Sequence, residues 1–284
     1  MAEFEYHFET CGEQLYRFLR LWLAETMPRD ELVGWLELAG RAEEWMEYFE
    51  QLSAVALTGR IVAAGRSLEA TYSADSKLYA REFRTYINDH ISISKDFLDK
   101  LMRLALQAVE VADGRIPKGA ASDARGWALH NHRHCYLCGD PLDFTPGASH
   151  DKIYTCEHIW PSSYGGDSVA ENFLPACQKC NSQKKRHFAT WAMVSVQSVI
   201  RGINPTEIDL DVIDGTPRFA LHHLAGQRYA INHGTSLKRA FLRIGPWTTL
   251  RVIDINDVAH FFNMDIHSAG VDIDLGDCNA RLRV

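Results

Sequence analysis

The residues best suited to chemistry in this chain include four cysteines arranged as two Cys-x-x-Cys pairs. One pair is Cys135 and Cys138, and the other is Cys177 and Cys180. Two such pairs indicate a metal site before they indicate disulfides, and four thiolates suit a tetrahedral Zn²⁺ ion. Because four thiolates leave no coordination position open for a substrate, we expect this zinc site to be structural.

A second group of residues, between and just after the cysteine pairs, could act on a substrate. Glu157 and His158 are adjacent, and Asn181 directly follows the last cysteine of the two pairs. Histidine is a general base near neutral pH, whereas Glu and Asn oxygens are hard ligands suited to Mg²⁺ or Mn²⁺. A base beside a hard divalent cation is what water-mediated hydrolysis of a phosphodiester requires. Because neighbouring residues of a strand point to opposite faces, we expect Glu157 and His158 at a strand end or in a bent loop.

The first part of the chain, residues 1–115, is expected to form a helical domain. Apolar side chains recur at helical spacing within Leu15–Trp22, and further helices are expected over 76–89 and 94–111. Gly and Pro residues concentrated in 113–126 indicate a linker after this domain.

The remainder of the chain divides into a middle and a C-terminal part. Residues 127–200 combine short, loop-rich segments with a helix that is expected to begin near Cys180. Residues 201–284 give mixed signals, with a strand expected over 248–255 and a short helix over 257–263. The expected fold class is therefore mainly α with α+β elements.

Composition and charge limit the function classes open to the chain. Its 284 residues are 46% hydrophobic and 24% charged, which is typical of a folded globular protein. No apolar run approaches the roughly 20 residues that cross a bilayer, and the N-terminus lacks a signal-peptide pattern. We therefore expect a cytoplasmic protein with no membrane partner. The net charge of −7, carried by residues 1–115, excludes a protein that coats nucleic acid through overall positive charge.

Further residues occur in a characteristic order between and after the cysteine pairs: Glu157–Pro161, Gly165–Gly166, Asn172, Asn181 and Lys184. This order resembles that of the HNH endonucleases, the zinc-containing branch of the ββα-metal nucleases, over residues 133–190. The resemblance implies a zinc-stapled ββα-metal HNH module within residues 127–200. That module would lie between a helical N-terminal domain and a small C-terminal α+β segment.

The resemblance also implies a role for each polar residue of the motif. His158 corresponds to the general base that activates water, and Glu157 to the metal-binding acidic residue before it. Asn172 corresponds to the asparagine that braces the loop and orients the histidine, and Asn181 stands at the last metal-ligand position. In the implied reaction, water activated by His158 attacks a DNA phosphate. Mg²⁺ or Mn²⁺ bound by Glu157 and Asn181 would stabilise the departing 3′ oxygen.

A basic stretch follows the second cysteine pair. Lys184, Lys185 and Arg186 belong to the densest run of positive charge in the chain, and beside an HNH site we expect them to contact phosphate. The acidic N-terminal domain is expected to dock a partner protein or to restrain the nuclease. The family context suggests a prokaryotic restriction or anti-phage defence system.

Two other functions remain open at this point. The chain could cleave RNA, as some toxins do, or it could be an inactive zinc-containing module that binds DNA or serves as a scaffold. The motif favours an enzyme, since a binding module has no need of a base beside metal ligands. Outside the motif, Cys156 is expected to be a small buried residue, and His222 and His223 are given no role. The sequence does not reveal the oligomeric state.

Overall fold

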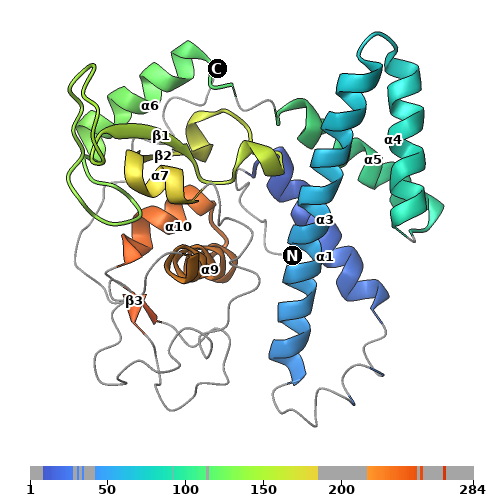
Figure 1. Cartoon of the computed structure of the whole chain (residues 1–284). Helices are drawn as coiled ribbons and strands as arrows, with labels where there is room; N and C mark the ends of the chain where they lie inside the picture. The colour runs from blue at the N-terminus through green and yellow to red at the C-terminus, as the bar shows by residue number, and fades with distance from the viewer. Residues whose placement is uncertain are drawn as a thin grey trace. The chain divides into compact units, whose positions relative to one another are not determined.

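The structure is a computed structural model, and it describes the following residues: 9–27, 31, 34, 42–91, 93–112, 115–184, 216–247, 250–251 and 265–266. This part of the chain is mainly helical, with eight α-helices and two small two-stranded sheets (Figure 1). The mainly α character expected from the sequence is confirmed. Among these residues, no helix is both long enough and apolar enough to cross a membrane.

The described residues group into two units, which do not follow the chain order. The first, called here the helical unit, comprises Glu9–Pro117 together with the loop His158–Asn172. The second, called here the cysteine unit, comprises the described residues of Lys118–Glu157 and of Phe173–Val284. The peptide bond between Glu157 and His158 is therefore one of the points where the chain passes from one unit to the other.

The described residues of the helical unit form four α-helices: α1 (Cys11–Thr26), α3 (Ala42–Tyr72), α4 (Ser76–His90) and α5 (Lys95–Glu110). Helices α4 and α5 agree to within one residue at each end with the helices that the sequence predicted over 76–89 and 94–111. Helix α1 begins at a capping box, in which Thr10 Oγ1 accepts a hydrogen bond from Glu13 N and the Glu13 carboxylate accepts one from Thr10 N.

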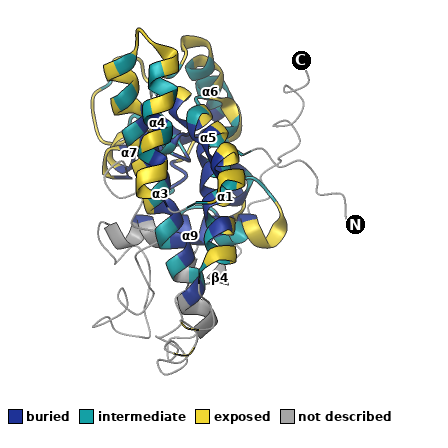
Figure 2. Ribbon diagram, turned by 90° about the vertical axis from the view of Figure 1, so that its right-hand side faces the viewer, coloured by how far each residue is buried: buried dark blue, intermediate teal, exposed yellow. Residues whose placement is uncertain are grey.

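The core of the helical unit is built from one face of each helix. Leu15 and Leu19 of α1, Phe83 of α4, and Leu101 and Ala105 of α5 are fully buried. Figure 2 shows this pattern as dark blue inner faces and yellow outer faces along the same helices. Burial of a Leu or Phe side chain contributes about 1.5–3 kcal/mol, so these apolar faces hold the helices together.

The cysteine unit contains the elements that carry the motif: α6 (Lys118–Asn131), β1 (Tyr154–His158), β2 (Phe173–Cys177), α7 (Gln178–Lys184), α9 (Thr216–His233), α10 (Leu237–Ile244), β3 (Leu250–Arg251) and β4 (Asp265–Ile266). Strands β1 and β2 form one sheet and are followed directly by α7, which gives a strand–strand–helix order. Strands β3 and β4 pair antiparallel, with Leu250 opposite Ile266.

The structure differs from the sequence-based expectations in two places. The linker predicted over 113–126 is wrong from Lys118 onward, because this segment forms the first part of α6. Gly119 and Gly126 indicated a loop, but each has open space around it and the Ala residues between and after them favour a helix. Helices α9 and α10 were not predicted, since neither continues long enough with a regular apolar spacing.

Several expected elements extend beyond the described residues. The helix expected from near Cys180 is present as α7, and its continuation past Lys184 lies outside them. The strand expected over 248–255 is represented by β3, whereas the helix expected over 257–263 lies outside the described residues.

His222 of α9 lies in the aromatic core of the cysteine unit. Its ring packs against Phe241 of α10 at a centroid distance of 5.1 Å and against Tyr136 at 6.1 Å. Its Nε2 donates a hydrogen bond to the Gly245 carbonyl oxygen at 2.8 Å. Burial, opposed by this bond and assisted by the positive charge of Lys184, lowers the pKa of His222 to about 4. The imidazole is therefore neutral at pH 7.

We predict that His222 makes the protein sensitive to acid. An unfolded histidine binds a proton near pH 6.5, whereas folded His222 does so near pH 4. Stability is therefore lost as pH falls from about 6.5 to 4, and His222 accounts for about 2 kcal/mol between pH 7 and 5. The variant His222→Gln keeps a donor for Gly245 and does not titrate.

Urea unfolding of zinc-saturated protein at pH 7 and pH 5 measures this effect. The free energy of unfolding of His222→Gln should fall less than that of the wild type over this range. Equal losses in the two proteins would contradict the assignment.

Candidate functional site

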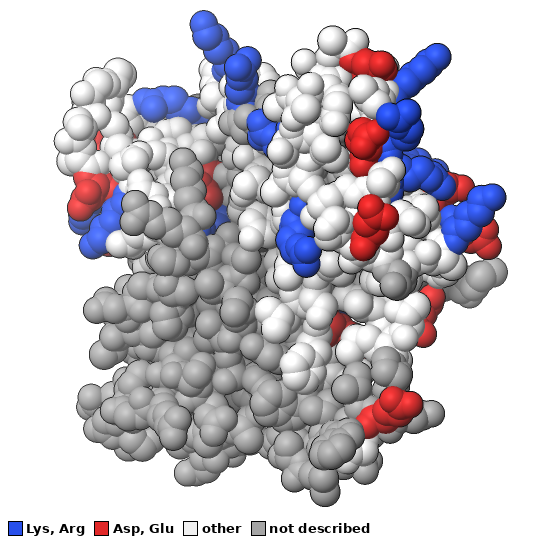
Figure 3. Space-filling view, turned by 45° about the vertical axis from the view of Figure 1, so that its right-hand side comes forward, with Lys and Arg blue, Asp and Glu red and all other residues white. Residues whose placement is uncertain are grey.

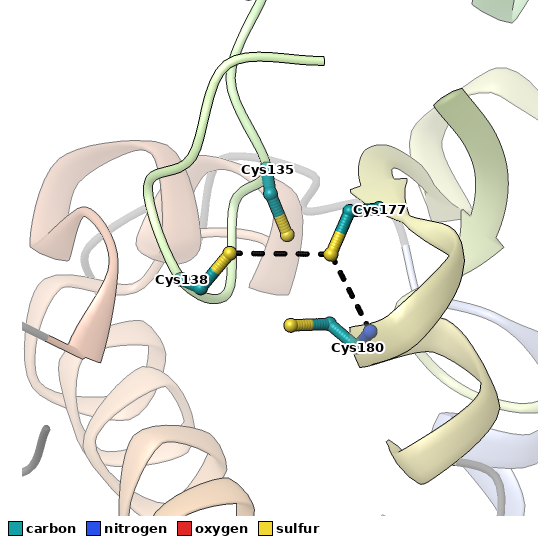
Figure 4. Close-up of side chains that lie close together, drawn as sticks. All are labelled: Cys135, Cys138, Cys177 and Cys180. Atoms are coloured by element: carbon teal, nitrogen blue, oxygen red, sulfur yellow. Dashed lines mark hydrogen bonds between the residues drawn. The ribbon is translucent and has the colours of Figure 1, made fainter. Parts of the chain in front are cut away.

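The four cysteines of the two Cys-x-x-Cys pairs come together in the cysteine unit. Cys135 and Cys138 lie in a turn before the sheet, Cys177 ends β2, and Cys180 lies in the first turn of α7. Their four Sγ atoms all lie within 4.8 Å of one another, and the four side chains converge on one point (Figure 4). A tetrahedral zinc site with Zn–S bonds of about 2.3 Å has sulfur atoms about 3.8 Å apart, so the arrangement fits Zn²⁺.

Backbone hydrogen bonds hold the first cysteine pair in place. Gly139, with φ of 80°, closes the turn by donating from its N–H to the Cys135 carbonyl oxygen at 2.8 Å. Tyr136 N donates to the Pro175 carbonyl oxygen of β2, and Trp247 N donates to the Leu137 carbonyl oxygen, both at 3.0 Å. The turn is thereby fixed between the sheet and the segment after α10.

The electrostatics of the cluster favour a bound cation. Burial raises the pKa of Cys135 well above its usual range, whereas a hydrogen bond from Cys135 lowers the pKa of Cys138. Four sulfur atoms this close together cannot all ionise without a compensating positive charge. A divalent cation at the centre would allow all four to become thiolates. The four cysteines could therefore hold a zinc ion.

A second polar cluster lies where α7 faces β1. Thr155 and Glu157 are two residues apart on β1 and thus share a face. Asn181 Nδ2 of α7 donates to Thr155 Oγ1 at 3.0 Å, and Lys184 Nζ, one helical turn later, lies 3.1 Å from Glu157 Oε1. These two contacts bring the Asn181 and Glu157 side chains to the same side of the strand.

The second cluster is buried and contains an acceptor without a hydrogen bond. Glu157, Asn181 and Lys184 are 5%, 8% and 4% exposed. Burial lowers the pKa of Lys184, although the neighbouring Glu157 opposes this shift. Asn181 Oδ1 is buried and makes no hydrogen bond to any described residue. Here a carboxylate and an amide oxygen that accepts no hydrogen bond lie on the same side of β1. Oxygen atoms of these two kinds are the ligands that a hard divalent cation prefers.

His158 is the last residue of β1, and its side chain is oriented by a residue that the sequence analysis did not single out. The His158 Nε2 atom and the Ser168 hydroxyl lie 3.0 Å apart and are hydrogen-bonded. Serine is common in loops, and no spacing rule relates Ser168 to a histidine ten residues earlier. The contact exists because the chain turns back between these residues.

Asn172 organises that turn. Its Oδ1 accepts a hydrogen bond from Trp160 N at 2.8 Å, and its Nδ2 donates to the carbonyl oxygens of Trp160 and Asp167, both at 2.9 Å. Gly166 is required beside this brace, since a Cβ there would lie 1.9 Å from the Trp160 carbonyl oxygen. Asn172 is 2% exposed, and it acts on the backbone of the loop that starts at His158.

The remaining site residues expected from the sequence are placed as follows. Lys184 is buried against Glu157, and its Nζ also lies 5.7 Å from the centre of the Tyr136 ring. Lys185 and Arg186 lie outside the described residues, so their expected contact with phosphate stays a prediction. Cys156, next to Glu157, is half-buried and takes no part in the cysteine cluster.

We predict one tightly held zinc ion per chain, bound by the four clustered cysteines. The variant Cys138→Ser should lose this zinc, and its cysteine unit should unfold, because metal binding to such a site supplies much of the folding free energy. The matched control is Cys156→Ser, which should retain the metal. Elemental analysis of purified protein and thermal melting provide the measurements. Loss of zinc from the control, or its retention in Cys138→Ser, would rule out the assignment.

Comparison with known proteins agrees with the geometry of the cysteine cluster. The sequence model of one family, described as HNH endonuclease, matches residues 135–192. The match begins at the first clustered cysteine and extends past α7. A search of curated proteins and a search of solved structures each give no match to this chain. Residues 135–192 of this chain are thus similar to the HNH endonuclease family.

Proposed function

We propose that the protein is a metal-dependent endonuclease that hydrolyses phosphodiester bonds of DNA. The observation that carries this proposal is the buried Asn181 Oδ1, an acceptor without a donor among the described residues, on the face of β1 that also bears Glu157. His158 follows Glu157 directly in the chain. A carboxylate, an amide oxygen and an imidazole are the three groups that metal-assisted hydrolysis by an HNH site needs.

Glu157 and Asn181 would hold the divalent cation, Mg²⁺ or Mn²⁺. Such a cation, when bound, supplies positive charge that stabilises the negative charge developing on the phosphate and on the leaving 3′ oxygen. Lys184 Nζ is ion-paired with Glu157 Oε1 at 3.1 Å and holds the carboxylate in place. The carboxylate is therefore already oriented before a cation binds.

His158 would take the proton from the attacking water. Its Nε2 is hydrogen-bonded to the Ser168 hydroxyl at 3.0 Å, which orients the ring. Asn172 fixes the backbone that follows His158 and thereby limits the movement of the ring. The products expected from attack on the phosphate with a leaving 3′ oxygen carry 5′-phosphate and 3′-hydroxyl ends.

Because the chain carries a net charge of −7, a nucleic acid must be bound by a local group of basic residues. On the face drawn in Figure 3, Lys and Arg side chains are interspersed with Asp and Glu, and the described residues there form no continuous basic patch. We therefore propose that Lys185 and Arg186, which follow Lys184 in the sequence, contribute phosphate contacts. A single HNH site acts on one strand at a time, so a monomer would nick duplex DNA. A restriction or anti-phage role, with a protein partner bound through the N-terminal domain, rests on the family context.

Two alternatives are tested by the same experiments. An HNH site could cleave RNA, and digestion of duplex DNA, single-stranded DNA and RNA side by side distinguishes the substrates. An inactive zinc-containing binding module is disfavoured by the buried Glu157 and the Asn181 oxygen without a donor, because neither serves a structural zinc site.

We predict that His158→Ala lowers the rate of Mg²⁺-dependent plasmid nicking by about 10²–10⁴-fold, the usual contribution of a general base. The matched control is His150→Ala, since His150 is exposed and its ring is paired with Asp143. The control should nick at the wild-type rate, and both variants should keep their zinc. Undiminished nicking by His158→Ala would end the assignment of this base.

We also predict that Asn181→Ala weakens Mn²⁺ binding by at least about tenfold, because it removes one oxygen ligand. The control Asn131→Ala changes an exposed asparagine at the end of α6 and should leave the affinity unchanged. Titration of zinc-loaded protein with Mn²⁺, followed by electron paramagnetic resonance, measures the affinity without requiring cleavage. Equal affinities in the wild type and Asn181→Ala would exclude Asn181 as a ligand.

A further inference from the structure

The loop His158–Asn172, which carries the candidate base, belongs to the helical unit. Two backbone N–H groups and one thiol in the first turn of α1 donate hydrogen bonds to this loop. Gly12 N donates to the Gly165 carbonyl oxygen at 2.7 Å, and Cys11 N donates to Asp167 Oδ2 at 2.6 Å. The Cys11 thiol also donates to Asp167 Oδ1 at 3.4 Å, so the Asp167 carboxylate is held through both oxygens.

These hydrogen bonds are favourable for a clear physical reason. The N–H groups of the first turn of a helix have no partner within the helix, and the helix dipole makes this end positive. The Asp167 carboxylate satisfies one of these N–H groups with a charge-assisted hydrogen bond. Burial raises the pKa of Cys11 to about 12, which keeps its thiol protonated as a donor.

Close packing restricts the loop further. A Cβ on Gly12 would lie 2.0 Å from the Tyr164 carbonyl oxygen and 2.4 Å from Trp160 Nε1. A Cβ on Gly59 of α3 would lie 2.7 Å from the Tyr164 ring, and one on Gly165 would lie 2.7 Å from Ala108 Cβ of α5. Three helices of the unit, α1, α3 and α5, therefore pack closely against the loop and restrict its movement.

The connection from α1 to the base runs through two consecutive residues. Asp167 binds the first turn of α1, and the next residue, Ser168, is hydrogen-bonded to the His158 ring. The carbonyl oxygen of Asp167 also accepts a hydrogen bond from Asn172 Nδ2, which fixes the backbone of this dipeptide. A shift of the first turn of α1 would therefore move the Ser168 hydroxyl.

We propose that the first turn of α1, acting through Asp167 and Ser168, sets the orientation of the His158 imidazole. Asp167 and Ser168 are positioning residues. Through them, the helical unit contributes to catalysis by orienting the base. This proposal rests on the function proposed above for His158, and it deepens that function. Because a base misplaced by about 1 Å can cost roughly 100-fold in rate, a partner that moves α1 would regulate cleavage.

Nuclear magnetic resonance of the full-length, zinc-loaded protein tests the structural part of the proposal without cleavage. The histidine rings are labelled with ¹⁵N, and the His158 signals are identified by their absence from His158→Ala. Asp167→Ala should shift the His158 ring signals, whereas Asp167→Asn, which retains an oxygen acceptor for Cys11 N, should keep them near their wild-type positions. The control Ser163→Ala changes an exposed serine of the same loop and should leave them unchanged.

Steady-state nicking with Mg²⁺ tests the functional part. Asp167→Ala and Ser168→Ala should lower kcat by about 10- to 100-fold with little change in KM, and Ser168→Thr, which retains the hydroxyl, should recover most of the rate. Unshifted His158 signals in Asp167→Ala would overturn the proposal. A wild-type protein that cleaves neither DNA nor RNA would instead refute the proposed function, and the resonance measurement would still decide the positioning role.

Discussion

Ligation of four sulfur atoms to one ion would fix the rotation of α7, and the arrangement of the two proposed oxygen ligands, Glu157 and Asn181, depends on that constraint. Cys177 ends β2 and Cys180 lies in the first turn of α7, so both must face the first cysteine pair. Each further helical residue advances by about 100°. This places Asn181 and Lys184 on the side of α7 that faces β1, where their contacts with Thr155 and Glu157 are found.

The polar groups of this face are costly for stability, which argues that they serve chemistry. Burial of an ion pair such as Glu157 with Lys184 gains little over apolar packing, because both charges lose their hydration. A buried acceptor without a donor, such as Asn181 Oδ1, costs about 1–3 kcal/mol. A divalent cation would satisfy the amide oxygen and would share the carboxylate with Lys184. Selection for stability alone would not be expected to retain these groups together.

The sequence predicted those parts of the site that depend on short-range spacing. The two Cys-x-x-Cys pairs predicted the cluster, since two residues between thiols suit one metal ion, and the structure places the four cysteines where they could hold one. The adjacent Glu157 and His158 were expected at a strand end, and β1 does end at His158. Helices α4 and α5 were predicted because their apolar residues repeat regularly over several turns.

The parts that escaped prediction depend on contacts between distant residues. Ser168 reaches His158 only because Gly165, with φ of 80°, and the Asn172 brace turn the chain back. Lys184 belongs to a run of basic residues that was expected to contact phosphate, and its burial depends on a carboxylate 27 residues away. The attachment of the loop to α1 joins residues 156 positions apart, and no local pattern signals such a pairing.

The most direct test of the account is a crystal structure of the zinc-loaded protein soaked in Mn²⁺, with anomalous diffraction recorded at wavelengths that distinguish the two metals. The account predicts zinc at the centre of the four cysteine sulfurs and manganese bound to both a Glu157 oxygen and Asn181 Oδ1. The account would be contradicted if no manganese were bound to these two oxygens, or if manganese were bound only elsewhere in the chain.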